Sequence, residues 1–191
     1  PALPVNTVTQ FLTLAKSKPG QTRMASAGIG SVSHLAGAAL QVHGRFESLH
    51  VPYRGGGPAA NDLIGGHIPM AFLSLSSAVP QLPTGKIKIV AVVEKSRYAA
   101  MPDVPAIAET LPGFEMTSWL GLFAPAGTPR SIVERLNREI VKVLQTTEVK
   151  ERLFNAGSEV VASSADTFGA AIKSEMTTLG KLIKDSGIRD D

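Results

Sequence analysis

The chain of 191 residues contains no cysteine and few aromatic residues. The missing thiols exclude disulfides, thiolate catalysis and cysteine-ligated zinc sites. Aromatic residues make up 5% of the chain and the basic residues are scattered, whereas nucleic-acid binding wants a dense basic face with aromatics between the charges. No apolar run approaches the length of a membrane span, and the first residues carry no basic-then-apolar leader. We therefore expect no nucleic-acid partner and no membrane insertion.

The charge of the chain is small and unevenly distributed. The formal net charge is +3, and residues 1–122 hold nine Lys and Arg against six Asp and Glu, while residues 123–191 hold ten of each. An excess in the first part suits a small anionic ligand, and a solvated surface explains it equally well. With 43% hydrophobic residues, the chain has enough apolar side chains to bury a core.

Strand-like and helix-like segments alternate in the first part of the chain. The patterns predict helices and strands in turn over residues 8–16, 22–27, 31–42, 48–53, 58–64, 68–73, 78–82 and 87–93. The last segment, IKIVAVV, is a nearly continuous apolar run, as in a strand buried on both faces. This alternation predicts an α/β fold with a mostly parallel central sheet flanked by helices.

The last part of the chain has helical patterns only. Residues 130–145 carry apolar residues at helical spacing, with Thr128 as the predicted cap and Pro129 in the first turn. Two more helices are predicted over residues 148–155 and 165–186. Three helices cannot close a sheet domain alone, so we expect this tail to pack poorly on the first 120 residues and to expose an apolar face. Such a face would drive dimerisation or domain swapping.

Two segments share the order strand, glycine-bearing loop, helix. They read ASAGIGSVSHLAG over residues 25–37 and VPYRGGGPAANDLIGG over residues 51–66. In a parallel sheet, such junctions lie at the carboxyl edge, where glycine lets backbone N–H groups approach a ligand. The helix that follows begins with unpaired N–H groups, which favour an anion, and Pro58 suits its first position. The two segments predict an anion site with both loops side by side; the alternative is two tight turns without a ligand.

Other motifs are incomplete. The segment GIGSVS lacks the third glycine of the dinucleotide fingerprint, and the second loop lacks the Gly-Lys-Ser/Thr of a phosphate loop. No Gly-x-Ser-x-Gly surrounds Ser31, although His34 could act as a base for it, which leaves a hydrolase as an open hypothesis. The other histidines lack metal-ligand spacing, so we expect neither a metal nor a cofactor.

Three segments together resemble the substrate-binding proteins of tripartite tricarboxylate transporters, the Bug family. They are GIGSVSHLAG, VPYRGGGPAANDLIGGHIPM and WLGLFAPAGTPRSIVERLN, and the resemblance covers nearly the whole chain. It implies a fold of the periplasmic-binding-protein kind, a two-lobed periplasmic clamp that closes on a small organic carboxylate. It also implies transient contact with the membrane subunits of a transporter, and no catalysis.

The resemblance also implies how the chain divides. Residues 1–122 would form the second, ligand-binding lobe, and residues 123–191 would form the crossover and the helices that complete the first lobe. The first-lobe segment of the family, with its signal peptide and Pro-x-Gly-Gly loop, has no counterpart here. We therefore expect roughly the N-terminal third of the family architecture to be absent, and with it half of the ligand clamp.

The positions that match the family motifs are the expected ligand contacts. They are Ala27, Gly28, Gly30, Ser31, His34, Arg54, Gly55, Gly56 and, at a strand end, Ser74. The segment SLSS, which begins at Ser74, stands where the family often has an acidic or amide residue, and this implies altered specificity. Two-lobed folds of this kind also serve as effector-sensing modules of regulators, which remains an alternative, although no DNA-reading helix pair is visible.

Overall fold

The computed structural model describes residues 3–189 and contains two compact units. One unit comprises the chain up to Ser118 together with the residues after Lys181, and the other comprises Trp119–Lys181. The boundary after Ser118 lies near the predicted division after residue 122. The assignment of these parts to lobes remains a prediction.

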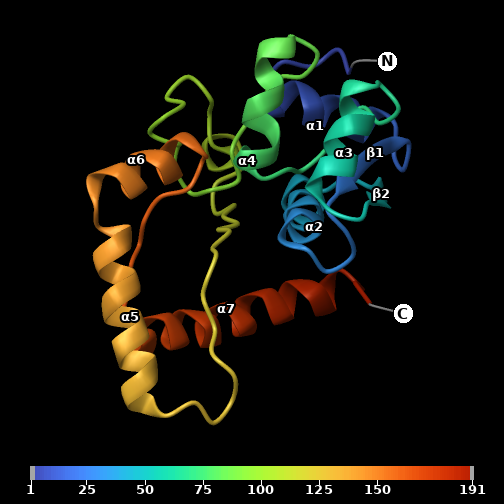
Figure 1. Cartoon of the computed structure of the whole chain (residues 1–191). Coiled ribbons are helices and arrows are strands. Elements are labelled where there is room, and N and C mark those ends of the chain that lie inside the picture. The colour runs from blue at the N-terminus through green and yellow to red at the C-terminus, as the bar shows by residue number, and fades with distance from the viewer. Residues whose placement is uncertain (1–2, 190–191) are drawn as a thin grey trace. The chain divides into compact units, whose positions relative to one another are not determined.

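The first unit contains alternating helices and strands (Figure 1). Its elements are α1 (Val8–Ser17), β1 (Thr22–Ser26), α2 (Val32–Gly44), β2 (Ser48–Pro52), α3 (Gly56–Ile64), the short α4 (Leu75–Ala78), and the 3-10 turns η1 (Val79–Thr84) and η2 (Ile107–Glu109).

Strand β1 is the centre of the sheet. It pairs in parallel with β2, from Thr22 opposite Ser48 to Ser26 opposite Pro52. On its other side Ala25 forms a parallel bridge with Ala71, in which the Ala25 N–H donates to the Met70 carbonyl at 2.9 Å. The predicted α/β fold with parallel strands is confirmed.

The two faces of this sheet are covered by different helices. On one face Ala25 packs with Ala59 of α3 and with Ile68 in a buried apolar cluster. On the other face Met24 and His50 line a small cavity together with residues of α2. Helices α2 and α3 therefore cover opposite faces, and both begin at the carboxyl ends of the strands.

Two of the predicted strands are wrong. Residues 68–73 contribute only the bridge at Ala71, and residues 87–93 form no strand, only an isolated bridge between Val92 and Ala106. In that bridge the Val92 N–H donates to the Pro105 carbonyl at 2.9 Å. A strand needs a ladder of partners along its length, whereas the described backbone hydrogen bonds of this apolar run lie at its end, at Val92 and at Val93, whose carbonyl accepts from the Met116 N–H at 3.0 Å.

Several helix boundaries also differ from the predictions. Helix α2 includes Gly44, the expected stop, as its last residue, and its C-cap Arg45 adopts a left-handed conformation with φ 53°. Helix α3 begins at Gly56, so Pro58 is its third residue rather than its first. The helix predicted over residues 78–82 is instead α4 followed by the 3-10 turn η1.

The second unit contains α5 (Arg130–Leu144), α6 (Thr147–Asn155) and most of α7 (Ala165–Asp185). The three helices agree with the predicted ones, and no residue of any of them is buried. The predicted cap of α5 is wrong: Pro129 occupies the N-cap position, and the Thr128 hydroxyl donates to the Pro125 carbonyl at 2.8 Å.

Contacts between side chains that are exposed or partly exposed hold the second unit together. The Phe168 ring lies edge-on to Trp119, with centroids 4.9 Å apart, and 5.5 Å from the Phe123 ring. Arg130 forms an ion pair with Asp166 at 3.0 Å, which joins the starts of α5 and α7. The described part of this unit thus relies on an aromatic cluster and polar links rather than on a buried core.

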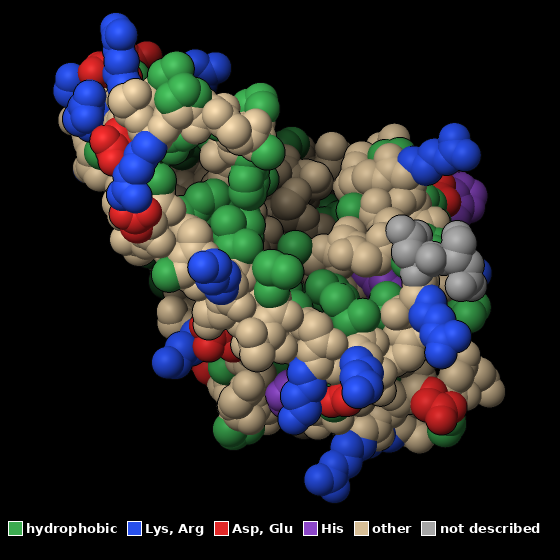
Figure 2. Space-filling model, turned by 90° about the horizontal axis from the view of Figure 1, so that it is seen from below, with side chains coloured by type: hydrophobic (Ala, Val, Ile, Leu, Met, Phe, Trp, Pro, Cys, Tyr) green, Lys and Arg blue, Asp and Glu red, His purple; other side chains and the backbone are tan. Residues whose placement is uncertain are grey.

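On the face in Figure 2, Lys and Arg side chains lie among Asp and Glu and form no continuous basic patch. Among the described residues, no helix combines the length and the apolar character that crossing a membrane requires.

Candidate functional site

The two glycine-bearing loops meet at the carboxyl ends of β1 and β2. The first loop, residues 27–31, follows β1, and the second loop, residues 53–57, follows β2 and includes the first two residues of α3. The Tyr53 N–H donates to the Ser26 carbonyl at 3.0 Å, and the Gly55 N–H donates to the Ala27 carbonyl at 2.9 Å. The predicted placement of the two loops side by side, each opening a helix, is confirmed.

Glycine is required where these loops turn and touch. Gly28, Gly30 and Gly55 adopt positive φ angles of 137°, 72° and 107°, a region that other residues occupy only with strain. A Cβ atom on Gly28 would also lie 3.2 Å from the Tyr53 carbonyl oxygen. The close approach of the two loops therefore depends on the glycine at position 28.

Serine hydroxyl groups in and beside the first loop accept hydrogen bonds from backbone N–H groups of the loop. The Gly28 N–H donates to Ser26 Oγ at 3.1 Å, and the Ala27 N–H donates to Ser33 Oγ at 2.9 Å. Ser31 is the N-cap of α2: its hydroxyl accepts from the His34 N–H at 3.3 Å and donates to the Gly28 carbonyl at 2.6 Å. The amides of Ala27 and Gly28, two of the expected ligand contacts, are thus occupied by the loop's own hydroxyls.

The start of α3, unlike the start of α2, has no side-chain cap. Its N-cap is Gly55, which supplies no side-chain acceptor, and the N–H groups of Gly56 and Gly57 occupy positions that have no partner within a helix. Pro58 follows and has no N–H. Helix α3 therefore directs two N–H donors and the positive end of its dipole away from the sheet, an arrangement that binds anions.

Hydroxyl groups of α4 lie beside this helix start. Ser74 Oγ is 2.9 Å from Ser77 Oγ and 3.0 Å from Ser76 Oγ, and a Cβ atom on Gly56 would lie 2.9 Å from Ser77 Oγ. The structure thus brings Ser74 to the second loop through Ser77. Arg54 is exposed at the edge of the same loop.

Two histidines, His34 and His50, lie next to the first loop. The rings of His34 and His50 are stacked, with centroids 3.7 Å apart and an interplanar angle of 5°. Burial lowers the pKa of His34, and burial together with the neighbouring His34 lowers the pKa of His50 to about 4. Both rings are therefore neutral at neutral pH.

The arrangement around Ser31 does not match a nucleophile and its base. His34 Nδ1 accepts from the Gly30 N–H at 3.2 Å, and the Ser31 hydroxyl donates to a backbone carbonyl. Nucleophilic catalysis needs a hydrogen bond from the hydroxyl to the base. The described contacts of these two residues are those of a helix cap and a loop support.

Sequence reasoning missed Ser26, Ser33 and His50. His50 lacks the spacing of a metal ligand, and it meets His34 only because β2 pairs with β1 in the register that sets His50 opposite Met24. The period-two alternation of β2, which separates His50 from Leu49 and Val51, was the signal available. Ser26 and Ser33 flank the first glycine loop, and their spacing around it was a further signal.

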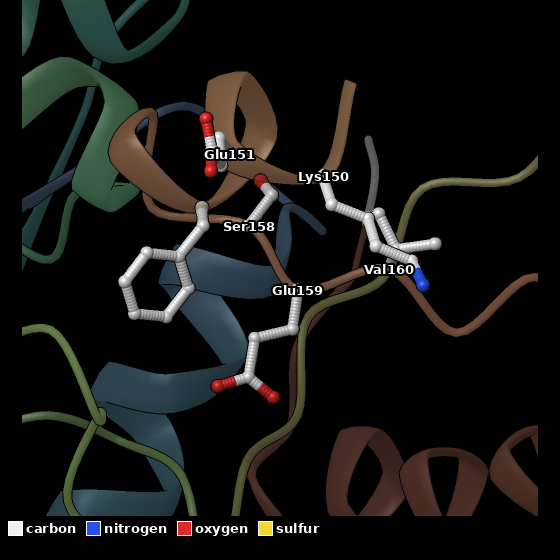
Figure 3. A pocket seen from close by; sticks show the side chains of 6 residues that line it. Lys150, Glu151, Ser158, Glu159 and Val160 are labelled. Carbon is white, nitrogen blue, oxygen red and sulfur yellow. The ribbon is translucent and has the colours of Figure 1, made fainter. Parts of the chain in front are cut away.

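A second hollow lies in the helical unit (Figure 3). It has a volume of about 290 Å³ and is lined by Lys150, Glu151, Phe154, Ser158, Glu159 and Val160. The cavity between the sheet and α2 measures about 10 Å³, room for about one water molecule. In the described part of the chain, no group of His, Asp and Glu could hold a metal ion.

Comparison with known proteins gives consistent matches. The family model described as "Tripartite tricarboxylate transporter family receptor" matches residues 1–188. A Pseudomonas sp. relative, the UPF0065 protein in the tcbD-tcbE intergenic region, is 41% identical over 178 residues, which cover 92% of this chain and 53% of the relative. The chain thus spans about half the length of that relative.

Two solved structures from Rhodopseudomonas palustris are similar to this chain. One, with adipate, is 29% identical with a TM-score of 0.92, and the match covers 97% of this chain and 62% of that one. The other, MatC with bound malate, is 30% identical with a TM-score of 0.82, and the match covers 94% of this chain and 63% of that one.

Proposed function

Because the chain belongs to the tripartite tricarboxylate transporter receptor family, we propose that it serves in an extracytoplasmic solute-binding protein that captures a small organic carboxylate. This is the family that the three sequence motifs predicted. The similar structures with adipate and with malate hold dicarboxylates, which supports a ligand of the same chemical class. The role is binding without chemical conversion.

The observation that carries this proposal is the open start of α3 beside the first loop. Gly56 and Gly57 offer two N–H donors at the positive end of a nine-residue helix. A carboxylate has two oxygens that accept such hydrogen bonds, and charge-assisted bonds of this kind are stronger than neutral ones. The proposed carboxylate position is therefore at Gly56 and Gly57, with Ser31 and Gly30 of the first loop on one side and the hydroxyls of Ser74 and Ser77 on the other.

The proposal extends to the division of the chain. Residues 1–122 would act as the second, ligand-binding lobe, and residues 123–191 would cross back and contribute to the first lobe, which completes the clamp. The protein would work in the periplasm and deliver its ligand to membrane subunits of a transporter by transient contact. In this role the backbone recognises the carboxylate, and Arg54, which is exposed, contributes a weaker and screened attraction.

Nuclear magnetic resonance of the ¹⁵N-labelled chain tests the proposal, since it detects weak binding and locates it. We expect adipate and malate to shift the amide resonances of Gly56 and Gly57 in a saturable way. Adipamide, which has the length of adipate without its charge, is the matched control and should shift them little. Shifts that are equal for adipate and adipamide, or that appear only away from the two loops, would contradict the proposal.

A further inference from the structure

The stacked histidines join two elements at the base of the first loop. His34 lies in the first turn of α2 and His50 in the middle of β2, and their rings are parallel and 3.7 Å apart. Such a contact fixes the orientation of both rings, because each one limits the rotation of the other.

Each ring is linked to a different amide of the first loop. His34 Nδ1 accepts directly from the Gly30 N–H at 3.2 Å. His50 Nε2 lies 2.6 Å from Ser26 Oγ, and this hydroxyl oxygen accepts from the Gly28 N–H at 3.1 Å. The two glycines with positive φ in this loop are therefore both held by the histidine pair, one directly and one through Ser26.

We propose that His34 and His50 act in their neutral forms as a positioning pair that holds the first loop in the conformation lining the carboxylate site. The ligand side of this inference rests on the proposed function, whereas the loop-holding side does not. As an acceptor, Nδ1 of His34 carries no proton, so the geometry assigns His34 to the tautomer with its proton on Nε2. Protonation of His34 places a proton on Nδ1, and the hydrogen bond from Gly30 is then lost.

The surroundings of the pair favour the neutral forms. The side chains that line the cavity beside the two rings carry no charge; those other than the histidines include Met24, Ser26, Ser33, Gln41 and Phe72. Each imidazole is thus the only titratable group that faces the other in this cavity. An imidazolium would have no carboxylate partner there and would repel a second one, which agrees with the lowered pKa values of both residues.

Two variants of His34 distinguish the effect of its Nδ1 acceptor from the effect of its stacked ring. In His34→Asn the side-chain oxygen can take the place of Nδ1 as an acceptor that does not titrate, and in His34→Phe the ring can still stack but accepts nothing. In the ligand-free chain, we expect the chemical shift of the Gly30 amide proton to change as acidification protonates His34. In His34→Asn this chemical shift should keep its neutral-pH value over the same pH range. In His34→Phe it should differ from that of the unmodified chain at every pH.

The ¹⁵N shifts of the His34 ring give an independent readout and should show a protonated Nε2 and an unprotonated Nδ1 at neutral pH. Three results would overturn the proposal. They are the opposite tautomer of His34, a Gly30 amide chemical shift in His34→Phe equal to that of the unmodified chain, and a Gly30 chemical shift in His34→Asn that still changes with pH as in the unmodified chain. If His34→Phe fails to fold, the comparison of the unmodified chain with His34→Asn still decides between these outcomes.

Ligand titrations then connect the pair to the site. At neutral pH we expect His34→Phe to weaken adipate binding about 2- to 10-fold more than His34→Asn does, the loss of about one hydrogen bond. Equal losses in both variants would overturn the positioning role. If no variant and not even the unmodified chain binds adipate, the proposed function fails, while the Gly30 readouts still report on the histidine pair.

Discussion

Helix α2 of the first unit buries seven of its residues, whereas α5 of the second unit buries none, although both carry an apolar stripe. In α2 the stripe meets the parallel sheet, and Leu35 and Leu40 are almost inaccessible to solvent. In α5 the corresponding residues Ile132 and Leu136 remain about half exposed, at 48% and 49%. A helical apolar stripe therefore predicts the helix, and it says nothing about whether the chain supplies a cover for it.

This difference changes what holds each unit together. Tertiary packing supplies most of the stability of helices in folded proteins, so α2 is stabilised by its burial. The described contacts of the second unit include instead the cluster of Trp119, Phe123 and Phe168 and the ion pair that joins Arg130 to Asp166. We therefore expect core substitutions to be costly in the first unit, and the aromatic cluster to be the sensitive point of the second.

Removing a phenylalanine from each unit should show most clearly that burial stabilises the two units to different extents. Phe114 is 1% exposed and lies edge-on to His43, so Phe114→Ala should lower the free energy of unfolding by about 3–5 kcal/mol. Phe123 is 72% exposed, and Phe123→Ala should cost about 1 kcal/mol or less. Urea denaturation followed by circular dichroism measures both. Equal losses would mean that exposure does not separate the two units.

A methyl group at Gly121 should test the aromatic cluster. A Cβ atom there would lie 2.1 Å from Cζ of Phe168, so Gly121→Ala should displace that ring from Trp119 and cost about 1–3 kcal/mol. The chain has one tryptophan, so its fluorescence reports on the cluster directly. Gly169→Ala is the control, since a Cβ atom at Gly169 meets nothing within 4 Å. An unchanged emission spectrum in Gly121→Ala would show that the cluster tolerates the shift.

The same contrast explains which features could be predicted from the sequence. The helices other than α4 and the strands β1 and β2 have local signals, namely periodicity and flanking glycines, and these elements lie within a few residues of their predicted bounds. The segment over residues 87–93 has an equally clear apolar pattern and forms no strand, because a strand depends on a partner elsewhere in the chain. Pairing is not local, and composition alone does not supply it.

The candidate site divides in the same way. The two glycine loops could be predicted, because each lies between a strand and a helix in one continuous segment. The stacked ring of His50 could not, since it reaches His34 only through the pairing of β2 with β1. The occupation of the Ala27 and Gly28 amides by Ser33 and Ser26 likewise depends on how the loop folds back on the start of α2.

Alanine in place of a helical glycine should have opposite effects in the two units. A Cβ atom on Gly180 in α7 meets nothing within 4 Å, so Gly180→Ala should stabilise the protein by about 0.5–1 kcal/mol. A Cβ atom on Gly44 in α2 would lie 2.7 Å from Cδ2 of Leu12, and Gly44→Ala should be destabilising. Thermal unfolding midpoints give both signs. A stabilising Gly44→Ala would show that the first unit is less tightly packed than its burial indicates.

The smallest expected effect is the acid dependence of an exposed ion pair in the first unit. Arg97 binds both carboxylate oxygens of Glu109, at 2.8 Å and 2.7 Å, and this contact, with the Ala106 N–H, lowers the pKa of Glu109 from 4.5 to about 2. A carboxyl group with a lowered pKa in the folded state contributes stability that is complete above pH 4.5 and is lost as the pH falls towards 2. The contribution is small because both side chains are nearly half exposed, at 47% and 43%.

The difference in unfolding midpoint between the unmodified chain and Glu109→Gln should therefore be constant from neutral pH to about pH 4.5 and should shrink below it. Glu134→Gln, which removes a partner of Arg130 on the surface of α5, is the matched control and should change the midpoint at neutral pH less than Glu109→Gln, because its ion pair is more exposed, at 75% and 51%. A difference for Glu109→Gln that stays constant down to pH 2 would mean that this carboxylate gains nothing from Arg97 on folding.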